Sequence, residues 1–352
     1  PSITPGAGGA IDVGKFYLQS GAWVQNAAAL PAFRVGDFGL ATDSDLAPSV
    51  TFLRAMAGTG ADAANAYAIG DVYGLQGMAT LRDKHYKLAR NIDAAGTADW
   101  YGGKGFLPIG RNVASKYFTG SFDGFGYVIS GLTIDRSSAS YVGLFGRVSG
   151  SQISNIGLVG GAVTGSGSVG GLVGYLDGGA SITNAYSTGA VTGSNYVGGL
   201  VGTRYGTGNI TNAYATGAVN GGGWTGGLVG SHNGGLIVRS YATGTVTGNK
   251  SVGGLVGEVD QSGRIRDSYA TGAVTGTGYN VGGLVGETIS VGTSIIRAYA
   301  TGSVTGGGYV GGLVGAMEGS ISNSYATGAV TSGGRDARWG GGGRGGGGAR
   351  AE

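Results

Sequence analysis

The sequence predicts an all-β protein, a right-handed parallel β-helix built from coils of about 28 residues with an irregular N-terminal cap. Three observations lead to this prediction: an unusual abundance of glycine, an internal repeat, and repeat residues that favour strands over helices. Glycine accounts for 82 of the 352 residues, whereas its ordinary share is about 7%. The five prolines and the 41% of hydrophobic residues exclude a collagen-like or a fully disordered chain, so the glycines must serve another repeat.

The repeat has two landmarks that follow each other in a fixed order. The first is Gly-Leu-(Val/Phe)-Gly, with leucines 27 to 29 residues apart, and the second is Tyr-(Ala/Ser)-Thr-Gly-x-Val. The leucines are Leu144, Leu172, Leu200, Leu228, Leu255, Leu284 and Leu313, and the tyrosines are Tyr186, Tyr214, Tyr241, Tyr269, Tyr299 and Tyr325. Self-similarity at a fixed period of this length is typical of a solenoid.

The residue types in each unit indicate strands. Gly, Val, Thr, Ile and Tyr dominate the units, and these residues are poor helix formers, whereas β-branched and aromatic residues form strands well. One unit has room for two or three short strands with glycine at the corners between them. We therefore expect one β-helix coil per unit, with neighbouring coils about 4.8 Å apart and a column of Leu, Val and Ile inside.

The residue before each repeat tyrosine indicates which way the tyrosine points. This position holds a small residue in every unit: Ala185, Ala213, Ser240, Ser268, Ala298 and Ser324. A position restricted to Ala or Ser is typical of a tight interior. If the strand continues unbroken, its alternation places Val191 inside and Tyr186 outside, and the tyrosines form an external ladder. A bend at the Thr-Gly step would reverse that orientation.

The segments before the repeats are less regular. Lys15–Leu18 and Ala22–Val24 read as short strands, and Asp71–Arg82 reads as a short helix with Asp71 as its N-cap. His85–Asp93 alternates like a strand, and Phe118–Asp135 reads as two strands joined by a turn. We divide the chain into an N-terminal cap (1–100), the solenoid repeats (101–331) and a Gly/Arg-rich tail (332–352) that we expect to be disordered.

Charge and composition exclude several classes of function. The tail holds Arg335, Arg338, Arg344 and Arg350 against Asp336 and Glu352, so it carries +2 of the formal +3 net charge. The remaining chain lacks the clustered Lys and Arg that binding to nucleic acid requires. The absence of cysteine excludes disulfides and thiolate chemistry, and no apolar run is long enough for a membrane-spanning helix. Because the chain starts at Pro1, we expect any secretion signal to have been removed or to lie upstream.

The Gly-Gly-Leu-Val-Gly units resemble the GLUG repeat of large secreted bacterial surface proteins, including filamentous-haemagglutinin-like adhesins. The preceding segments resemble those that introduce such repeats, for example Tyr86–Asp93, Phe118–Gly124 and Tyr141–Gly146. The likeness covers about residues 65–331. The resemblance implies export and display at the cell surface. It implies no particular activity, because these repeats also accompany enzymatic domains elsewhere in longer chains.

Carboxylates supply one candidate site. Glu258 and Glu287 occupy the same position after Gly-Leu-Val-Gly in adjacent units, and Asp260 follows two residues later. Stacked coils would hold the two glutamates about 5 Å apart, near the spacing of a retaining glycosidase or of a calcium site. The same position holds Tyr, Thr, Ser or Ala in the other units, so a variable, solvent-exposed position is the simpler interpretation. The two histidines, His85 and His232, lie in unrelated contexts and suggest no catalytic or zinc site.

The tyrosine ladder supplies the other candidate site. Outward-facing aromatic rings beside threonine hydroxyls would suit sugar rings, which present apolar faces and polar rims. Tyrosines that only shield and connect the coils are the structural alternative.

From these observations we expect a secreted or cell-surface adhesin segment that is not an enzyme, needs no cofactor and binds a host receptor or glycan. The alternative is a structural subunit that forms extracellular fibres by end-to-end stacking, since a solenoid end is an exposed strand edge. A glycan-active enzyme using Glu258 and Glu287 is a more remote alternative.

Overall fold

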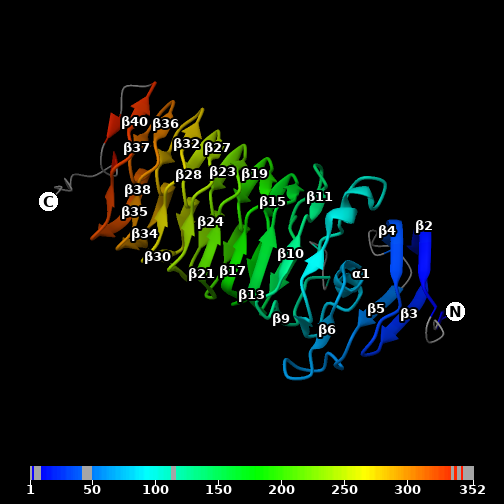
Figure 1. Cartoon of the computed structure of the whole chain (residues 1–352). Coiled ribbons are helices and arrows are strands. Elements are labelled where there is room, and N and C mark those ends of the chain that lie inside the picture. Colours follow the sequence, from blue (N-terminus) through cyan, green and yellow to red (C-terminus); the bar gives the residue numbers. More distant parts are fainter. Residues whose placement is uncertain are drawn as a thin grey trace.

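The computed structural model describes residues 2–3, 9–41, 50–111, 116–333, 337–338 and 342–343. These residues form a parallel β-solenoid of about 11 coils that follow one another roughly every 28 residues. Figure 1 shows the coils stacked side by side along one axis, with the N-terminal and C-terminal strands at opposite ends. The predicted fold class is therefore confirmed.

Three parallel sheets run along the solenoid, and each strand pairs with its equivalent one coil away. The 22-stranded sheet contains β6 (Tyr67–Ile69), β7 (Tyr86–Leu88), β8 (Ile92–Asp93), β9 (Phe122–Asp123), β10 (Val128–Ser130), β12 (Phe145–Ser149), β13 (Gln152–Val159), β16 (Val173–Asp177), β17 (Ser181–Ser187), β20 (Val201–Tyr205), β21 (Asn209–Ala215), β24 (Val229–Asn233), β25 (Leu236–Val238), β26 (Tyr241–Ala242), β29 (Val256–Asp260), β30 (Arg264–Arg266), β31 (Tyr269–Ala270), β34 (Val285–Ile296), β35 (Tyr299–Ala300), β38 (Val314–Ser322), β39 (Tyr325–Ala326) and β42 (Gly342–Gly343). The eight-stranded sheet contains β11 (Thr133–Asp135), β14 (Ala162–Thr164), β18 (Ala190–Thr192), β22 (Val219–Asn220), β27 (Val246–Gly248), β32 (Val274–Gly276), β36 (Val304–Gly306) and β40 (Val330–Ser332). The seven-stranded sheet contains β15 (Gly167–Gly170), β19 (Asn195–Gly198), β23 (Gly223–Gly226), β28 (Lys250–Gly253), β33 (Val281–Gly282), β37 (Val310–Gly311) and β41 (Ala337–Arg338).

The N-terminal strands pair separately from these sheets. β1 (Ser2–Ile3), β3 (Gly21–Asn26) and β5 (Val50–Ala55) form one parallel sheet, and β2 (Ile11–Leu18) pairs with β4 (Phe33–Leu40). Their interior is aromatic, because Phe16, Trp23, Phe33, Phe38 and Phe52 pack against one another with ring centroids 5.2 to 6.4 Å apart. This N-terminal region is therefore more regular than the cap expected from its sequence.

The helix N-cap is as predicted, but the helix is shorter. Asp71 accepts a 2.9 Å hydrogen bond from the backbone N–H of Gly74 and begins α1 (Val72–Gly77), which continues into the 3-10 helix η1 (Met78–Thr80). A second 3-10 helix, η2, spans Ala95–Asp99. With a single α-helix of six residues, the described part of the chain has no helix able to cross a membrane.

Two other sequence predictions were too coarse. The expected strand over His85–Asp93 is broken into β7 and β8, because the backbone bends at Ala89 and Arg90 between them. Phe118–Asp135 forms three short strands, β9, β10 and β11, instead of two. In the tail, where we expected disorder, Ser332 ends β40 and is followed by Gly333, and Ala337–Arg338 and Gly342–Gly343 pair with β37 and β38. The rest of the tail lies outside the described residues.

The core of the repeats is the predicted column of aliphatic side chains. Val173, Val201, Val229, Val256, Val285 and Val314 are in register one coil apart, and each is completely buried. The burial of each such side chain contributes about 1.5 to 3 kcal/mol. The same contact recurs in every coil, so stability comes from repetition between neighbours.

The glycines of the motif are required by close packing between backbones. A Cβ atom on Gly198 would lie less than 3.0 Å from the carbonyl oxygen of Val201, and one on Gly199 would lie as close to the carbonyl oxygen of Gly227. At Gly202 the obstacle would be the backbone of the previous coil, at Val169. The high glycine content therefore allows the chain to fold tightly onto the coil before it and the coil after it.

Candidate functional site

The six repeat tyrosines form the ladder that the alternation predicts. Ala185 and Ser187 are buried, whereas Tyr186 between them is half-buried at the surface, and Val191 is buried as expected. The rings of Tyr186, Tyr214, Tyr241, Tyr269, Tyr299 and Tyr325 stack with centroids 4.7 to 5.3 Å apart and interplanar angles of 1 to 8°. Burial raises the pKa of Tyr214, Tyr269 and Tyr299.

This stacking limits what the ladder can bind. Each ring in the middle of the ladder has another tyrosine on both faces, so a sugar ring has no free face to lie on. A ligand can reach the ring edges and the phenol hydroxyls. Binding by the ladder remains a prediction, and a role in connecting the coils follows directly from the ring contacts, since each stacked pair contributes about 0.5 to 1.5 kcal/mol.

Two other columns of side chains lie on β15–β16 and the equivalent strands; the sequence analysis missed the first column and identified the second only as the variable position of Glu258 and Glu287. The first column consists of left-handed residues with φ between 47 and 64°: Tyr141, Ser168, Tyr196, Trp224, Ser251 and Asn280. The second is the position directly after each Gly-Leu-(Val/Phe)-Gly: Arg147, Tyr175, Thr203, Ser231, Glu258 and Glu287. Comparison of the repeat units could also have revealed the first column, because its positions in these six units hold only aromatic or polar residues.

Side chains of the first column contact side chains of the second column one coil further on. Tyr141 stacks on Tyr175 with ring centroids 4.7 Å apart, and the hydroxyls of Ser168 and Thr203 are hydrogen-bonded at 2.8 Å. Within the first column, the ring of Tyr196 stacks on Trp224 of the next coil with centroids 4.8 Å apart. The two columns are therefore one continuous surface along the solenoid axis.

This surface contains an open groove of about 430 Å³. Its lining residues are Ser140, Tyr141, Ser166, Gly167, Ser168, Tyr175, Asn195, Tyr196, Thr203, Ser231, Asn233 and Glu258. We call it the aromatic groove. A volume of this size falls within the usual range for small-molecule sites, about 300 to 1,000 Å³.

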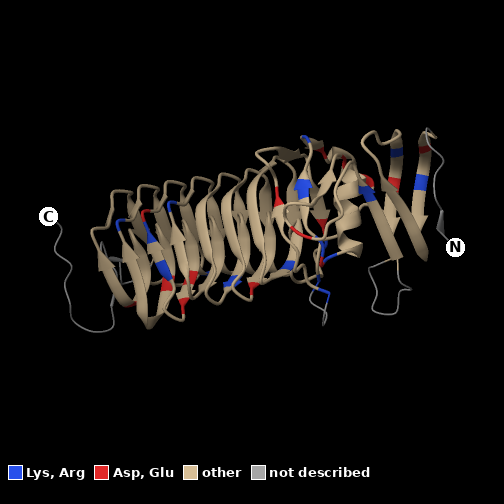
Figure 2. Ribbon diagram, turned by 90° about the horizontal axis from the view of Figure 1, so that it is seen from below, with Lys and Arg blue, Asp and Glu red and all other residues tan. Residues whose placement is uncertain are grey.

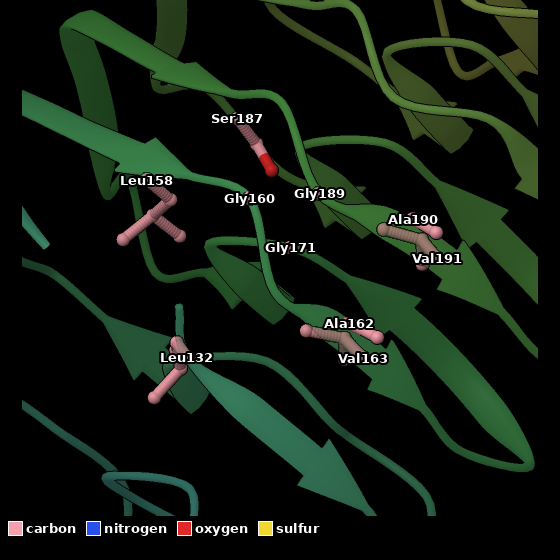
Figure 3. A pocket seen from close by; sticks show the side chains of 10 residues that line it. All are labelled: Leu132, Leu158, Gly160, Ala162, Val163, Gly171, Ser187, Gly189, Ala190 and Val191. Carbon is pink, nitrogen blue, oxygen red and sulfur yellow. The ribbon is translucent and has the colours of Figure 1, made fainter. Parts of the chain in front are cut away.

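The crevice in Figure 3 differs sharply from the aromatic groove. It lies between the ends of β13 and β17 and the strands β11, β14 and β18, and its lining is formed by Leu132, Leu158, Gly160, Ala162, Val163, Gly171, Ser187, Gly189, Ala190 and Val191. Its volume is about 10 Å³, roughly the space for one water molecule. It is therefore a packing gap between strands and has no room for a ligand.

Glu258 and Glu287 are partners in register on β29 and β34, as their spacing predicted. Glu287 is not solvent-exposed: it is 8% exposed, and its carboxylate accepts hydrogen bonds from Trp224 (3.2 Å), Ser251 (2.5 Å) and Asn280 (2.6 Å). The simpler interpretation of this position as a solvated surface is wrong for Glu287, because two neighbouring coils fold polar side chains over it.

Glu258 lies at the end of the aromatic groove. It accepts a 3.0 Å hydrogen bond from Ser231, and burial, together with the negative charge of Glu287, raises its pKa. Asp260 lies further along β29, where its carboxylate accepts a 2.6 Å hydrogen bond from the N–H of Gln261. Among the described residues, no group of three or more His, Cys, Asp or Glu side chains is placed to hold a metal ion.

The two histidines lie in different environments. His85 is partly exposed, and its Nδ1 lies 2.8 Å from the hydroxyl of Ser121. His232 lies inside the core, completely buried, directly next to Arg204 of the preceding coil. His85 therefore lies beside a serine hydroxyl, whereas neither ring nitrogen of His232 makes a well-formed hydrogen bond, so the two histidines occupy unrelated contexts.

These features define a class of protein: a repeat-built β-solenoid whose sides carry columns of stacked aromatic and polar residues. The GLUG motif matches four segments of the chain, at residues 165–192, 193–220, 248–275 and 306–331. The chain thus contains GLUG repeats, as its sequence suggested.

Two relatives share part of this sequence. Halomucin of Haloquadratum walsbyi is 43% identical over 115 residues, which are 32% of this chain and 1% of halomucin. A protein of Evansella cellulosilytica named as a Gly-rich membrane protein is 40% identical over 85 residues, which are 24% of this chain and 10% of that protein. The chain thus spans a small fraction of both relatives.

A solved structure shares the fold. It is the crystal structure of a Bacteroides ovatus protein named as an immunoglobulin A1 protease, with a TM-score of 0.56 and 24% sequence identity, covering 78% of this chain and 79% of that one. At this identity the likeness concerns the fold alone.

Proposed function

We propose that this chain is a non-enzymatic β-solenoid segment of an extracellular surface protein, an adhesin whose sides present a binding surface to a host receptor or glycan. The observation that carries the proposal is the surface formed by the two side-chain columns, which continues from coil to coil and opens into the aromatic groove. The match to a small part of halomucin supports a place in a large surface protein.

The charge distribution supports a binding role that does not depend on strong electrostatic attraction. In Figure 2, few ribbon segments in the middle coils are coloured as Lys, Arg, Asp or Glu, and most of the coloured segments lie at coil edges and toward the two ends of the solenoid. A ligand of these coils would therefore be recognised by hydroxyl, amide and aromatic groups.

The geometry favours a non-enzymatic role over a glycan-active enzyme. A retaining mechanism needs one carboxylate as a free nucleophile. Glu287 is held by three protein donors, so its oxygens are engaged in the resting protein. Glu258 alone does not supply the second group.

Fibre formation by end-to-end stacking is the second candidate. One observation favours it: the last complete coil is less well covered than the others, since Tyr325 is 56% exposed and Val330 is half-buried. Against it, β41 and β42 pair with the strands of that end and occupy part of the edge that a second copy would need.

The test of the adhesin proposal is binding of the labelled, purified chain to host or microbial cell surfaces across a dilution series. We expect saturable binding whose apparent affinity does not change as the chain is diluted before mixing. Binding that disappears on dilution, or no binding to any surface, would contradict the proposal.

A further inference from the structure

The ring stacking along the two columns is interrupted between Tyr175 and Tyr196. C-terminal to this place, the side chain of Lys250 covers one face of Trp224 at 4.7 Å from the ring centroid, and Tyr196 covers the other face. N-terminal to it, Tyr141 stacks on Tyr175, whose ring also has the guanidinium of Arg147 within 5.6 Å. Between the two stacks lie the small side chains of Ser168 and Thr203.

This interruption leaves aromatic surface uncovered. The neighbour of Tyr196 in the preceding coil is Ser168, through the register of β15 and β19, and a serine is too small to cover a phenol ring. Tyr175 is likewise followed in the next coil by Thr203. Unlike the rings of the tyrosine ladder, Tyr175 and Tyr196 thus each border an open space, and both line the aromatic groove.

The floor and rim of the groove are polar. The hydroxyls of Ser168, Thr203 and Ser231 belong to side chains that are 0 to 6% exposed, so they form a fixed floor. Asn195 and Asn233 add amide groups at the rim, and Glu258 adds a carboxylate at one end. Among the described lining residues there is no Lys or Arg, and Arg147 behind Tyr175 is paired with Asp177 at 2.6 Å, so an uncharged ligand suits the groove better than an anion.

We propose that the aromatic groove is a binding site for an uncharged oligosaccharide, with sugar rings placed against Tyr175 and Tyr196 over the floor of Ser168 and Thr203. A pyranose ring has an apolar face that fits an aromatic ring and hydroxyls that fit serine, threonine, asparagine and carboxylate groups. The groove runs along the solenoid axis, so a chain of sugars fits it better than one compact molecule. This proposal rests on the proposed adhesin function and names the ligand class and the site.

The repeat itself supplies a variant that closes the groove without disturbing the backbone. Ser168 has a φ of 51°, and the equivalent positions one coil away on either side hold tyrosine in the same conformation, Tyr141 at 61° and Tyr196 at 53°. The substitution Ser168→Tyr should therefore fold and place a ring against Tyr196, where the ligand would lie. Tyr196→Ala removes the wall instead. Tyr309→Ala, at the position equivalent to Asn280 in a coil far from the groove, is the matched control, and Tyr241→Ala tests the tyrosine ladder.

The experiment measures binding of the full chain to an array of uncharged and acidic oligosaccharides, followed by titration monitored through the fluorescence of the tryptophans, which include Trp224 beside the groove. We expect the parent chain to bind uncharged oligosaccharides, and Ser168→Tyr and Tyr196→Ala each to weaken binding about tenfold or more, a loss of about 1.4 kcal/mol. Tyr309→Ala should bind like the parent. Circular dichroism and thermal unfolding establish that each variant is folded.

Three results would overturn this inference. Binding that survives Ser168→Tyr and is lost with Tyr241→Ala would assign the ligand to the ladder. If the chain binds cell surfaces saturably but binds no uncharged oligosaccharide, the sugar-site proposal is wrong and the adhesin proposal stands. If the chain binds neither, both proposals are wrong.

Discussion

At the residue scale, the most unexpected feature is a pair of basic side chains inside the solenoid. Arg204 and His232 occupy a core position that holds Leu176 and Val259 in the neighbouring coils, and both are 0% exposed. One guanidinium nitrogen of Arg204 donates to the carbonyl oxygens of Gly206 and Gly234, so the side chain satisfies the backbone at the corner between two coils. Burial lowers its pKa to about 10.

His232 makes stability depend on pH. Burial, and then the nearby charge of Arg204, lower its pKa to about 3, and neither ring nitrogen makes a well-formed hydrogen bond. The unfolded chain takes up the proton below about pH 6.5 and the folded chain does not, so stability is present above that pH and decreases toward pH 3. We predict that the increase in the free energy of unfolding caused by His232→Val is about 2 kcal/mol larger at pH 5 than at pH 8. Urea unfolding at both pH values measures this, and equal effects at pH 5 and pH 8 would contradict the buried neutral histidine.

At the scale of the repeat element, the motif glycines bring successive coils into contact. Gly226 lies in β23, and a Cβ atom there would be 2.7 Å from the amide nitrogen of Gly257 in the next coil, with the carbonyl oxygen of Val229 closer still. Overpacking of this kind typically costs about 1 to 3 kcal/mol. We predict that Gly226→Ala lowers the free energy of unfolding by at least about 2 kcal/mol, measured by thermal or urea unfolding.

The control for this prediction is Gly96→Ala. Gly96 lies in η2 with no atom within 4 Å of its missing Cβ, so the change should be neutral or slightly stabilising. Equal losses in the two variants would show that glycine flexibility, and not close packing, is what the motif supplies.

At the scale of the whole molecule, the fold could be predicted because the same unit is repeated. Seven units show which positions stay aliphatic, small or variable, and this places the valine column inside and the tyrosine ladder outside. The aromatic groove could not be predicted from the sequence. It depends on the coil-to-coil positions that lack an aromatic residue, Ser168 and Thr203, and on the contacts that side chains of the first column make with side chains of the second column one coil further on. The buried state of Glu287 was also hidden, because its column varies from unit to unit and the side chains that cover it come from other positions. The burial of His232 was hidden because it departs from the Leu176 and Val259 of its own column.

The N-terminal region could be predicted less well for the same reason. Its core of Phe16, Trp23, Phe33, Phe38 and Phe52 is assembled from non-repeated contacts, so no comparison between units indicates which side chains face inward. The N-cap at Asp71 could be predicted, because a cap is a local hydrogen bond that the sequence alone specifies.

The central claim is that this β-solenoid acts as a single rigid segment with binding sites on its sides. Electron microscopy of the purified chain, without ligand, over a concentration series tests it most directly. With about 11 coils in the described residues and about 4.8 Å between coils, the account predicts isolated rods on the order of 50 Å long at every concentration. Filaments that lengthen with concentration and repeat at the length of one chain would contradict it and establish end-to-end assembly as the function.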